Sequence, residues 1–407
     1  MAILPHWLLG PPVRAPGASL GSVTGTVRIA HISDCYLPRL GGIEVQVHDV
    51  ASRQVRAGHD VLALTATPGE GPERGHQVET LDGVSVHRLS IPMPFELPVN
   101  PFAPRLMREI LGADVDVVHV HTGVVSPFAL DGARVAQALL LPTVVTWHCL
   151  LGAAEPAFRL LDRGLGWASR PVALSAVSDV AAAPLRRIAG RGTAVAVLPN
   201  GIDVAAWRVS PAARDDDAVH LVATMRLAPR KRPLPLLRML REVRRLVPAG
   251  VPLRASVIGE GPARPTLQRF LTRHGMGGWV RLLGRLPRDE IRDLYRRADI
   301  FLAPSELESF GIAALEARCA GLPVVAKAVS GIREFVHDGQ EGLLAGSDLE
   351  MVDAVVRLVT DAELRERITR HNREVEPAMS WPDVLKRTEA EYLRAIGLNA
   401  ARSGGKG

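Results

Sequence analysis

The 407-residue sequence has few aromatic residues, few cysteines and few lysines, and each scarcity excludes a class of protein. Aromatic residues make up 4% of the chain, too few for a lectin that stacks sugars on tryptophan and tyrosine rings. The three cysteines, Cys35, Cys149 and Cys319, lie far apart and form no CxxC pair, which is typical of reduced thiols in a reducing compartment. The four lysines leave few candidates for the Schiff base of a pyridoxal enzyme.

Long apolar runs and targeting signals are also missing. No run approaches the roughly 20 residues of a membrane span. Residues 1–26 lack the basic and apolar regions of a secretory signal, and we expect a disordered extension there. The net charge of +6 comes from arginine and favours anionic partners, but no aromatic residues are interleaved with the basic ones as nucleic-acid binding requires. We therefore expect a cytoplasmic protein that binds no nucleic acid.

Short valine-rich strands alternate with amphipathic helices along the chain, which is typical of parallel sheets buried on both faces. The rhythm breaks once, at a stretch that contains Pro211 and the acidic run Asp215–Asp217. The sequence thus predicts an α/β fold with two Rossmann-like doubly wound lobes facing a central cleft. The expected divisions are a first lobe at 27–200, a linker at 201–218, a second lobe at 219–380, a helix at 381–396 that packs back on the first lobe, and a disordered tail at 397–407.

The segment 305–316 (SELESFGIAALE) is the strongest motif, because it joins a buried strand to the start of a helix. Backbone N–H groups of Ser309, Phe310 and Gly311 could bind a phosphate there, although an ordinary capped helix explains the same pattern. Glu308 and Glu316 are eight residues apart, about 12 Å along a helix. This spacing favours two contacts on one extended ligand over an acid/base pair acting on one bond.

This segment resembles the E-x7-E motif of retaining glycosyltransferases of the GT-B fold, family 4. Further landmarks of that family occur in the same order over residues 27–396. They are Gly41-Gly42 with Glu44, the HxH strand end His119–His121, LPNGID at 198–203, the basic loop 226–231, VIGEGP at 257–262 and VRLLGRLP at 280–287. The departures are Met225 before the basic loop, where glycine is frequent, and Ser330-Gly331, where Gly-Gly is frequent.

The resemblance implies a role for each matching residue. Arg226 and Lys231 would hold the donor's diphosphate, Glu316 the ribose and Glu308 the donor sugar. It implies catalytic roles for His121, Glu308, Arg226 and Lys231. It implies a donor site made of Gly41, Gly42, Arg226, Lys231, Gly284, Arg285, Leu286, Glu308, Ser309, Phe310, Gly311, Ile312 and Glu316. It implies that the acceptor side contains Glu44, His121 and His148. The other arginines near the basic loop are expected to form, for the most part, a solvated helix face. They are Arg230, Arg232, Arg238, Arg241, Arg244 and Arg245.

Histidines at two neighbouring strand ends raise the question of a metal. His119 and His121 share one face of a strand, and His148 ends the next strand, so a three-histidine metal site is one interpretation. No acidic or cysteine ligand pattern accompanies them. We therefore expect no metal and no cofactor, with the nucleotide sugar acting as a substrate.

The predicted function is transfer of a hexose-type sugar from a UDP- or GDP-sugar to a hydroxyl acceptor, with retention of configuration. Asp131 and the stretch 119–152 resemble enzymes that glycosylate phosphatidylinositol, which implies an inositol lipid, with a small metabolite as the other option. Peripheral contact with the inner membrane face would then use Arg53, Arg56 and the apolar stretch 91–102, which otherwise read as solvated surface. Two alternatives remain: a nucleotide-sugar epimerase on the same fold, and a non-catalytic partner that binds sugar nucleotides.

Overall fold

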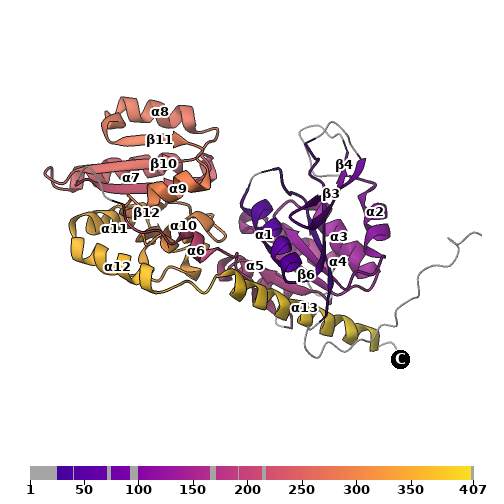
Figure 1. Ribbon diagram of the computed structural model, residues 1–407. Coiled ribbons are helices and arrows are strands. Elements are labelled where there is room, and N and C mark those ends of the chain that lie inside the picture. The colour runs from indigo at the N-terminus through magenta and orange to yellow at the C-terminus, as the bar shows by residue number, and fades with distance from the viewer. Residues whose placement is uncertain are drawn as a thin grey trace, which may run out of the picture.

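The computed structural model describes residues 25–39, 41–70, 75–91, 100–165, 171–190, 192–212 and 217–404. Nearly all of the expected extension at 1–26 lies outside these residues. The described chain forms two α/β lobes, each built on a predominantly parallel sheet, as the sequence predicts (Figure 1).

The first lobe carries a sheet with strand order β3-β4-β2-β1-β5-β6-β7-β8. Its strands are β1 (Arg28–Ser33), β2 (Asp60–Thr65), β3 (Gly75–Leu81), β4 (Val84–Ser90), β5 (Val117–Thr122), β6 (Thr143–Trp147), β7 (Ala173–Ala176) and β8 (Val195–Val197). Its helices are α1 (Gly42–Arg56), α2 (Ala103–Leu111), α3 (Pro127–Ala138), α4 (Glu155–Leu165) and α5 (Asp179–Ala189). The edge strand β3 pairs antiparallel with β4, and every other pair in this sheet is parallel.

The second lobe carries a sheet with strand order β11-β10-β9-β12-β13-β14. Its strands are β9 (Val219–Thr224), β10 (Leu253–Ile258), β11 (Val280–Gly284), β12 (Ile300–Ala303), β13 (Val324–Lys327) and β14 (Gly342–Ala345). Its helices are α7 (Pro233–Leu246), α8 (Arg264–Arg273), α9 (Arg288–Tyr295), α10 (Ile312–Cys319), α11 (Asp348–Thr360) and α12 (Ala362–Glu374), and the short α6 (Val204–Trp207) lies in the expected linker.

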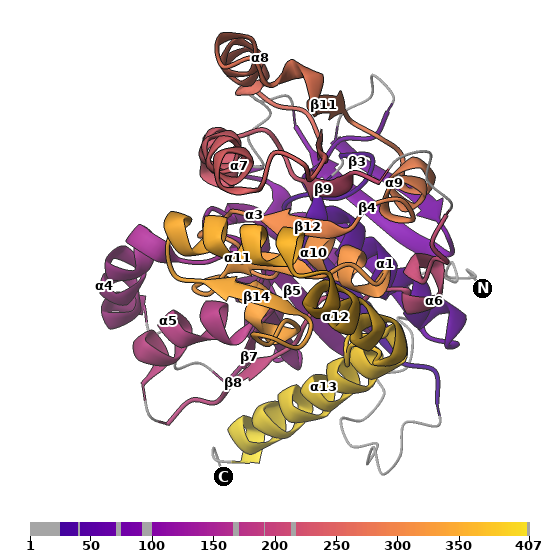
Figure 2. The same cartoon turned by 90° about the vertical axis from the view of Figure 1, so that its left-hand side faces the viewer.

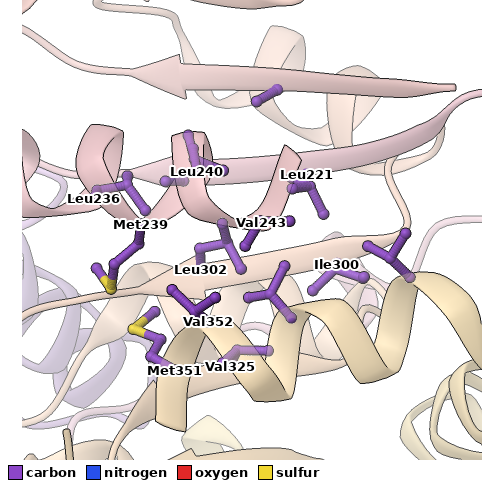
Figure 3. Packing of buried hydrophobic residues seen from close by; sticks show 14 of the residues in the cluster. Leu221, Leu236, Met239, Leu240, Val243, Ile300, Leu302, Val325, Met351 and Val352 are labelled. Carbon is purple, nitrogen blue, oxygen red and sulfur yellow. The ribbon is translucent and has the colours of Figure 1, made fainter. Parts of the chain in front are cut away.

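The core of the second lobe lies between its sheet and two helices. Figure 3 shows Met239 and Leu240 of α7 and Val352 of α11 directed at Leu302 of β12. Each such buried side chain contributes about 1.5–3 kcal/mol relative to an exposed one. This packing fixes the sheet whose strand ends carry the basic loop and the E-x7-E motif.

The last helix, α13 (Trp381–Gly404), leaves the second lobe and runs along the first (Figures 1 and 2). Arg394 donates to the carbonyls of Leu174 and Ala194, and Asn399 donates to the carbonyl of Leu140. The sequence predicted that this helix ends at residue 396 and that a disordered tail follows from 397. The helix instead continues to Gly404, so the prediction is wrong for residues 397–404. The extra turns persist because they still bond to the first lobe.

In each sheet, the order in which successive strands are added reverses beside the strand that comes first in the chain. β1 lies between β2 and β5, and β9 lies between β10 and β12. Loops leaving neighbouring strands at such a point run in opposite directions and open a crevice at the carboxyl ends of the strands. Most of the predicted site residues follow these strands, which puts them at the two crevices.

Candidate functional site

Two helix N-termini face each other between the lobes. α1 begins at Gly42 and α10 at Ile312, and a Cβ atom built on Gly42 would lie 3.5 Å from Ile312 Cδ1. In the described structure, neither Gly41 nor Gly311, the two N-cap residues, provides a side-chain cap. The N-cap residues therefore leave the first N–H groups of both helices without a side-chain cap of their own, which suits an anion site between the lobes, although the Glu44 carboxylate lies over Gly41 at the start of α1.

The loop before α10 is held in shape by two glycines. Gly311 has a φ of 94°, a conformation that residues with a Cβ rarely adopt. Gly331 donates its N–H to the carbonyl of Glu308 at 2.8 Å, and a Cβ on Gly331 would lie 2.0 Å from the carbonyl oxygen of Ser309. The change to Ser330 in the expected Gly-Gly pair thus leaves unaltered the glycine that the packing requires.

The basic loop and the E-x7-E motif meet directly. Lys231 Nζ lies 2.5 Å from a carboxylate oxygen of Glu308, and both side chains are less than one-fifth exposed. Arg226, at the end of β9, is exposed and makes no ion pair with any residue that the structure describes. The site therefore holds one paired and one unpaired cation at the point where the second sheet changes direction.

A further charged network supports this loop and was not predicted. The ammonium group of Lys327, a side chain that is 1% exposed, lies 2.5 Å from Asp348, and Arg232 lies 2.8 Å from the same carboxylate. Arg232 also pairs with Glu306. The assignment of Arg232 to a solvated helix face is therefore wrong, because it joins the start of α7 to the loop after β12. A lysine inside a buried strand, VVAK, was the available signal.

Glu316 is a half-buried acid without a hydrogen-bond partner among the described residues. Burial raises the pKa of its carboxyl group to about 7, although the charge of Arg288 partly opposes the shift. No hydrogen bond joins this carboxyl to another described residue. Since a buried polar group without a partner is costly, the site favours a ligand that donates hydroxyl protons to it, such as a ribose.

Nucleotide binding should therefore be linked to the ionisation of Glu316. The folded-state pKa lies above the usual 4.5, so the stability gained from the protonated form is complete below pH 4.5 and is lost as pH rises through 7. Ribose hydroxyls bind the ionised form, so affinity for a nucleoside diphosphate should rise about tenfold between about pH 6 and pH 8. Calorimetric titration at several pH values measures this slope.

Glu316→Gln is the matched control for that titration. The terminal phosphate of the nucleotide also titrates near pH 6, so both proteins share that part of the slope. The variant should bind more weakly and keep only the shared part. Equal slopes for the two proteins would contradict the assignment of Glu316 to the ribose.

The predicted base site lies at the end of β11. Gly284 has a φ of 78° and accepts a hydrogen bond from the N–H of Gly259 at 2.7 Å, while Arg285 is exposed and Leu286 is half-buried. The structure thus places these residues at the carboxyl edge of the second sheet. Their contact with a base stays a prediction.

The first lobe contributes the ends of β5 and β6 as the opposite wall. Burial raises the pKa of the Cys149 thiol, which also responds to the charges of Arg230, Lys231 and Glu308. The loop after β6, which begins at His148, leaves the carboxyl edge of the first sheet, where the crevice of that lobe opens. His121 is buried near it, with Nδ1 3.0 Å from His148 Nε2 and Nε2 2.9 Å from His31 Nδ1.

His31 was missed by the sequence analysis. It lies opposite His119 in the register of β1 with β5, so a histidine in each of two strands becomes a contact only when the strand order is known. Glu44, the other predicted acceptor-side residue, is buried, lies 3.4 Å from Arg39 and folds over Gly41. A Cβ on Gly41 would lie 2.3 Å from its carboxylate, which explains the glycine there.

A histidine cluster forms, but with a different membership from the predicted one. Ring nitrogens of His31, His119 and His121 lie within 4.8 Å of one another. All six nitrogens of these rings already hydrogen-bond to protein groups, and the cluster contains no carboxylate or thiolate. Burial lowers the pKa of all three, to about 4 for His31. This donor set fits neutral, hydrogen-bonded imidazoles.

Comparison with known families accounts for both lobes. The family model described as Glycosyltransferase Family 4 matches residues 40–206, and the model described as Glycosyl transferases group 1 matches residues 205–375. The chain belongs to family 4 of the GT-B-fold glycosyltransferases. The predicted fold, family and enzyme class are thereby confirmed, and neither the epimerase nor the non-catalytic alternative is favoured.

Individual relatives of this glycosyltransferase are distant but extend over most of its length. A phosphatidylinositol N-acetylglucosaminyltransferase subunit from Arabidopsis thaliana is 27% identical, over 91% of this chain and 82% of the relative. The GDP-mannose-dependent alpha-(1-6)-phosphatidylinositol monomannoside mannosyltransferase of Mycobacterium tuberculosis is also 27% identical, over 92% and 100%.

Solved structures share the fold of this glycosyltransferase. HepE from Anabaena, in complex with UDP, matches with a TM-score of 0.70 and 20% identity, over 90% of this chain and 99% of that one. No helix in the described residues of the glycosyltransferase has both the length and the apolarity to span a membrane.

Proposed function

We propose that this glycosyltransferase moves a hexose-type sugar from a UDP- or GDP-sugar to a hydroxyl group of an inositol lipid, with retention of configuration. The observation that supports the reaction most directly is the Lys231–Glu308 pair beside the unpaired Arg226. These cations and the two helix N-termini are the charges that a departing nucleoside diphosphate requires. A donor with a diphosphate leaving group fits this arrangement.

The state of the acids near the cleft bears on the route of a retaining transfer, while retention itself is proposed from the family resemblance. Glu308 is paired with Lys231, Glu44 with Arg39, and the pKa of Glu316 is raised to about 7. None of these three is a free carboxylate suited to attack the anomeric carbon. We therefore infer same-face attack by the acceptor hydroxyl, with the leaving phosphate taking its proton, and a reaction that needs no divalent metal.

The acceptor proposal rests on relatives whose names specify phosphatidylinositol or its mannoside. Their glycosylation would require peripheral contact with a membrane, on its cytoplasmic side. Arg53 does not serve this contact as predicted, because it pairs with Asp49 and lies 4.1 Å from the centre of the Trp381 ring. Most of the expected apolar stretch 91–102 lies outside the described residues.

An exposed basic surface between α2 and α3 is the better candidate for membrane contact. A groove of about 560 Å³ there is lined by Arg105, Arg108 and Arg134 together with Asp131. Arg134 pairs with Asp131 and Arg105 with Glu109, but all three of these arginines are exposed, whereas Arg53 is largely covered. Phe102 is 70% exposed just before α2 and Val125 is 81% exposed just before α3. Exposed apolar side chains beside arginines fit the interface of an anionic membrane.

The proposal is tested first by the nucleotide and then by the acceptor. UDP or GDP, but not both equally, should raise the melting temperature, because a ligand of the folded state stabilises it by mass action. Transfer from the matching nucleotide sugar to phosphatidylinositol in vesicles should then give an α-linked product from an α-linked donor, equally with and without EDTA. Stabilisation without lipid product would refute the acceptor, an inverted product would refute retention, and EDTA sensitivity would refute metal independence.

A further inference from the structure

A continuous line of buried polar side chains runs from the end of β6 to the last helix. From His148 Nε2 it passes to His121 Nδ1 at 3.0 Å, and from His121 Nε2 to His31 Nδ1 at 2.9 Å. His31 Nε2 then lies 2.7 Å from Gln54 Oε1, and Gln54 Nε2 lies 2.9 Å from the hydroxyl of Tyr392 in α13. We call this line, with its continuation below, the histidine relay.

The relay continues from Tyr392 into the first sheet. The Tyr392 hydroxyl lies 3.1 Å from His119 Nδ1, and His119 Nε2 lies 2.8 Å from Thr146 Oγ1. Thr146 Oγ1 lies 2.8 Å from Ser175 Oγ, and Ser175 Oγ lies 3.4 Å from the carbonyl oxygen of Val145, which is long for a hydrogen bond. The direction of the relay is fixed instead at Gln54, because an amide Nε2 can only donate and an amide Oε1 can only accept.

The directions of the hydrogen bonds between Gln54 and Thr146 follow from that amide. Gln54 Nε2 donates to the Tyr392 hydroxyl, and the hydroxyl donates its own proton to His119 Nδ1. The proton of His119 is then on Nε2, which donates to Thr146 Oγ1. Gln54 Oε1 then accepts from His31 Nε2–H.

The directions of the remaining hydrogen bonds, from His31 to His148 at the cleft, follow in the same way. His31 Nδ1 accepts from His121 Nε2–H, and His121 Nδ1 accepts from His148 Nε2–H. All four imidazoles are therefore neutral and protonated on Nε2. His148 Nδ1 is the one ring nitrogen in the relay with no hydrogen bond to a described residue, and it carries a lone pair.

We propose that the histidine relay fixes the tautomers of His121 and His148, so that His148 Nδ1 accepts a hydrogen bond from a substrate hydroxyl at the cleft. The role of this acceptor rests on the proposed glycosyl transfer. His148 follows β6 directly, at the carboxyl edge of the first sheet where the crevice opens. Gln54 and Tyr392 are then positioning residues that act through the imidazoles without touching substrate.

Tyr392 gives the relay a feature that local sequence cannot show. The residue belongs to α13, whose start follows the second lobe, yet its hydroxyl lies between Gln54 of α1 and His119 of β5. It is 7% exposed. The proton arrangement at the cleft wall is therefore set by a helix from the opposite end of the chain.

The tautomers can be measured directly on the full chain. In protein labelled with 15N-histidine, two-bond 1H–15N correlations near pH 7.5 should show Nε2–H for His31, His119, His121 and His148, each assigned by single substitution. An Nδ1–H tautomer or a protonated ring at His121 or His148 in the wild type would overturn the proposal. Because this measurement needs no donor or acceptor, it stands apart from any failure of the proposed glycosyl transfer.

Variants then test whether the tautomers matter for transfer. Gln54→Met and Tyr392→Phe keep similar volume and break the relay, and each should lower kcat about tenfold, with KM for the donor unchanged and the Nδ1–H form of His121 appearing. Tyr36→Phe is the matched control, because buried Tyr36 also bonds to a histidine, His48, outside the relay. A loss of kcat in the control equal to that in both relay variants would show a merely structural role and overturn the proposal.

Discussion

Lys231→Ala should lower kcat/KM by about a thousandfold, the largest single-residue effect that we expect on catalysis. The substitution removes a cation that neutralises the departing diphosphate. It also leaves the half-buried Glu308 carboxylate, now 2.5 Å from Lys231 Nζ, without its partner beside an anionic ligand. Steady-state kinetics with the donor identified by thermal shift measure the loss.

Two companion variants show where that loss comes from. Arg238→Ala is the control, since Arg238 is exposed on α7 and forms no ion pair among the described residues, and its kcat/KM should stay within about twofold of wild type. Adding Glu308→Gln to Lys231→Ala should recover part of the activity if repulsion from the unpaired carboxylate contributes. Equal activities of Lys231→Ala and Arg238→Ala would contradict the placement of Lys231 at the diphosphate.

Gly331→Ala should strongly destabilise the protein near the site. The new methyl group would lie 2.0 Å from the carbonyl oxygen of Ser309, a backbone atom that no side-chain rotation can move away. We expect a loss of about 3 kcal/mol or more in the free energy of unfolding and a fall of roughly 10 °C in melting temperature. Nucleotide binding should also be lost, because the loop at Glu308–Gly311 must shift.

Gly277→Ala serves as the matched control for this strain. A Cβ on Gly277 meets nothing within 4 Å, so the melting temperature should change by about 1 °C or less. Calorimetry and nucleotide titration on both variants give the comparison. A Gly331→Ala protein that melts and binds nucleotide as the wild type does would mean that the two loops are not in contact.

The lobes and motifs could be predicted because their signals are local. Strands such as 28–33 and 300–303 are short apolar runs followed by turn residues, and the E-x7-E segment is one continuous stretch. Strand β3 was not predicted because its sequence, GHQVETL, is mostly polar and exposed at a sheet edge. Helices α4, α11 and α12 and strand β14 were also absent from the sequence-based reading.

The sequence could nominate site residues only one position at a time, and their roles stay predictions. The pairing of Lys231 with Glu308 joins two loops that are 77 residues apart, and each had been given a separate ligand contact. The contact of His31 with His121 depends on β1 lying beside β5. Such relations arise from strand order and loop packing, which a one-dimensional pattern does not contain.

The return of α13 to the first lobe has a consequence for how such genes can recombine. The linker around 201–218 looks like a natural crossover point, where one parent could supply the lobe before it and another the lobe after it. Yet Tyr392 and Arg394, which complete hydrogen bonds of the first lobe, are encoded after the whole of the second lobe. A chimera therefore needs two crossovers, so that α13 is inherited with the lobe that it serves, and a nascent chain cannot finish its first lobe until the second lobe has been translated.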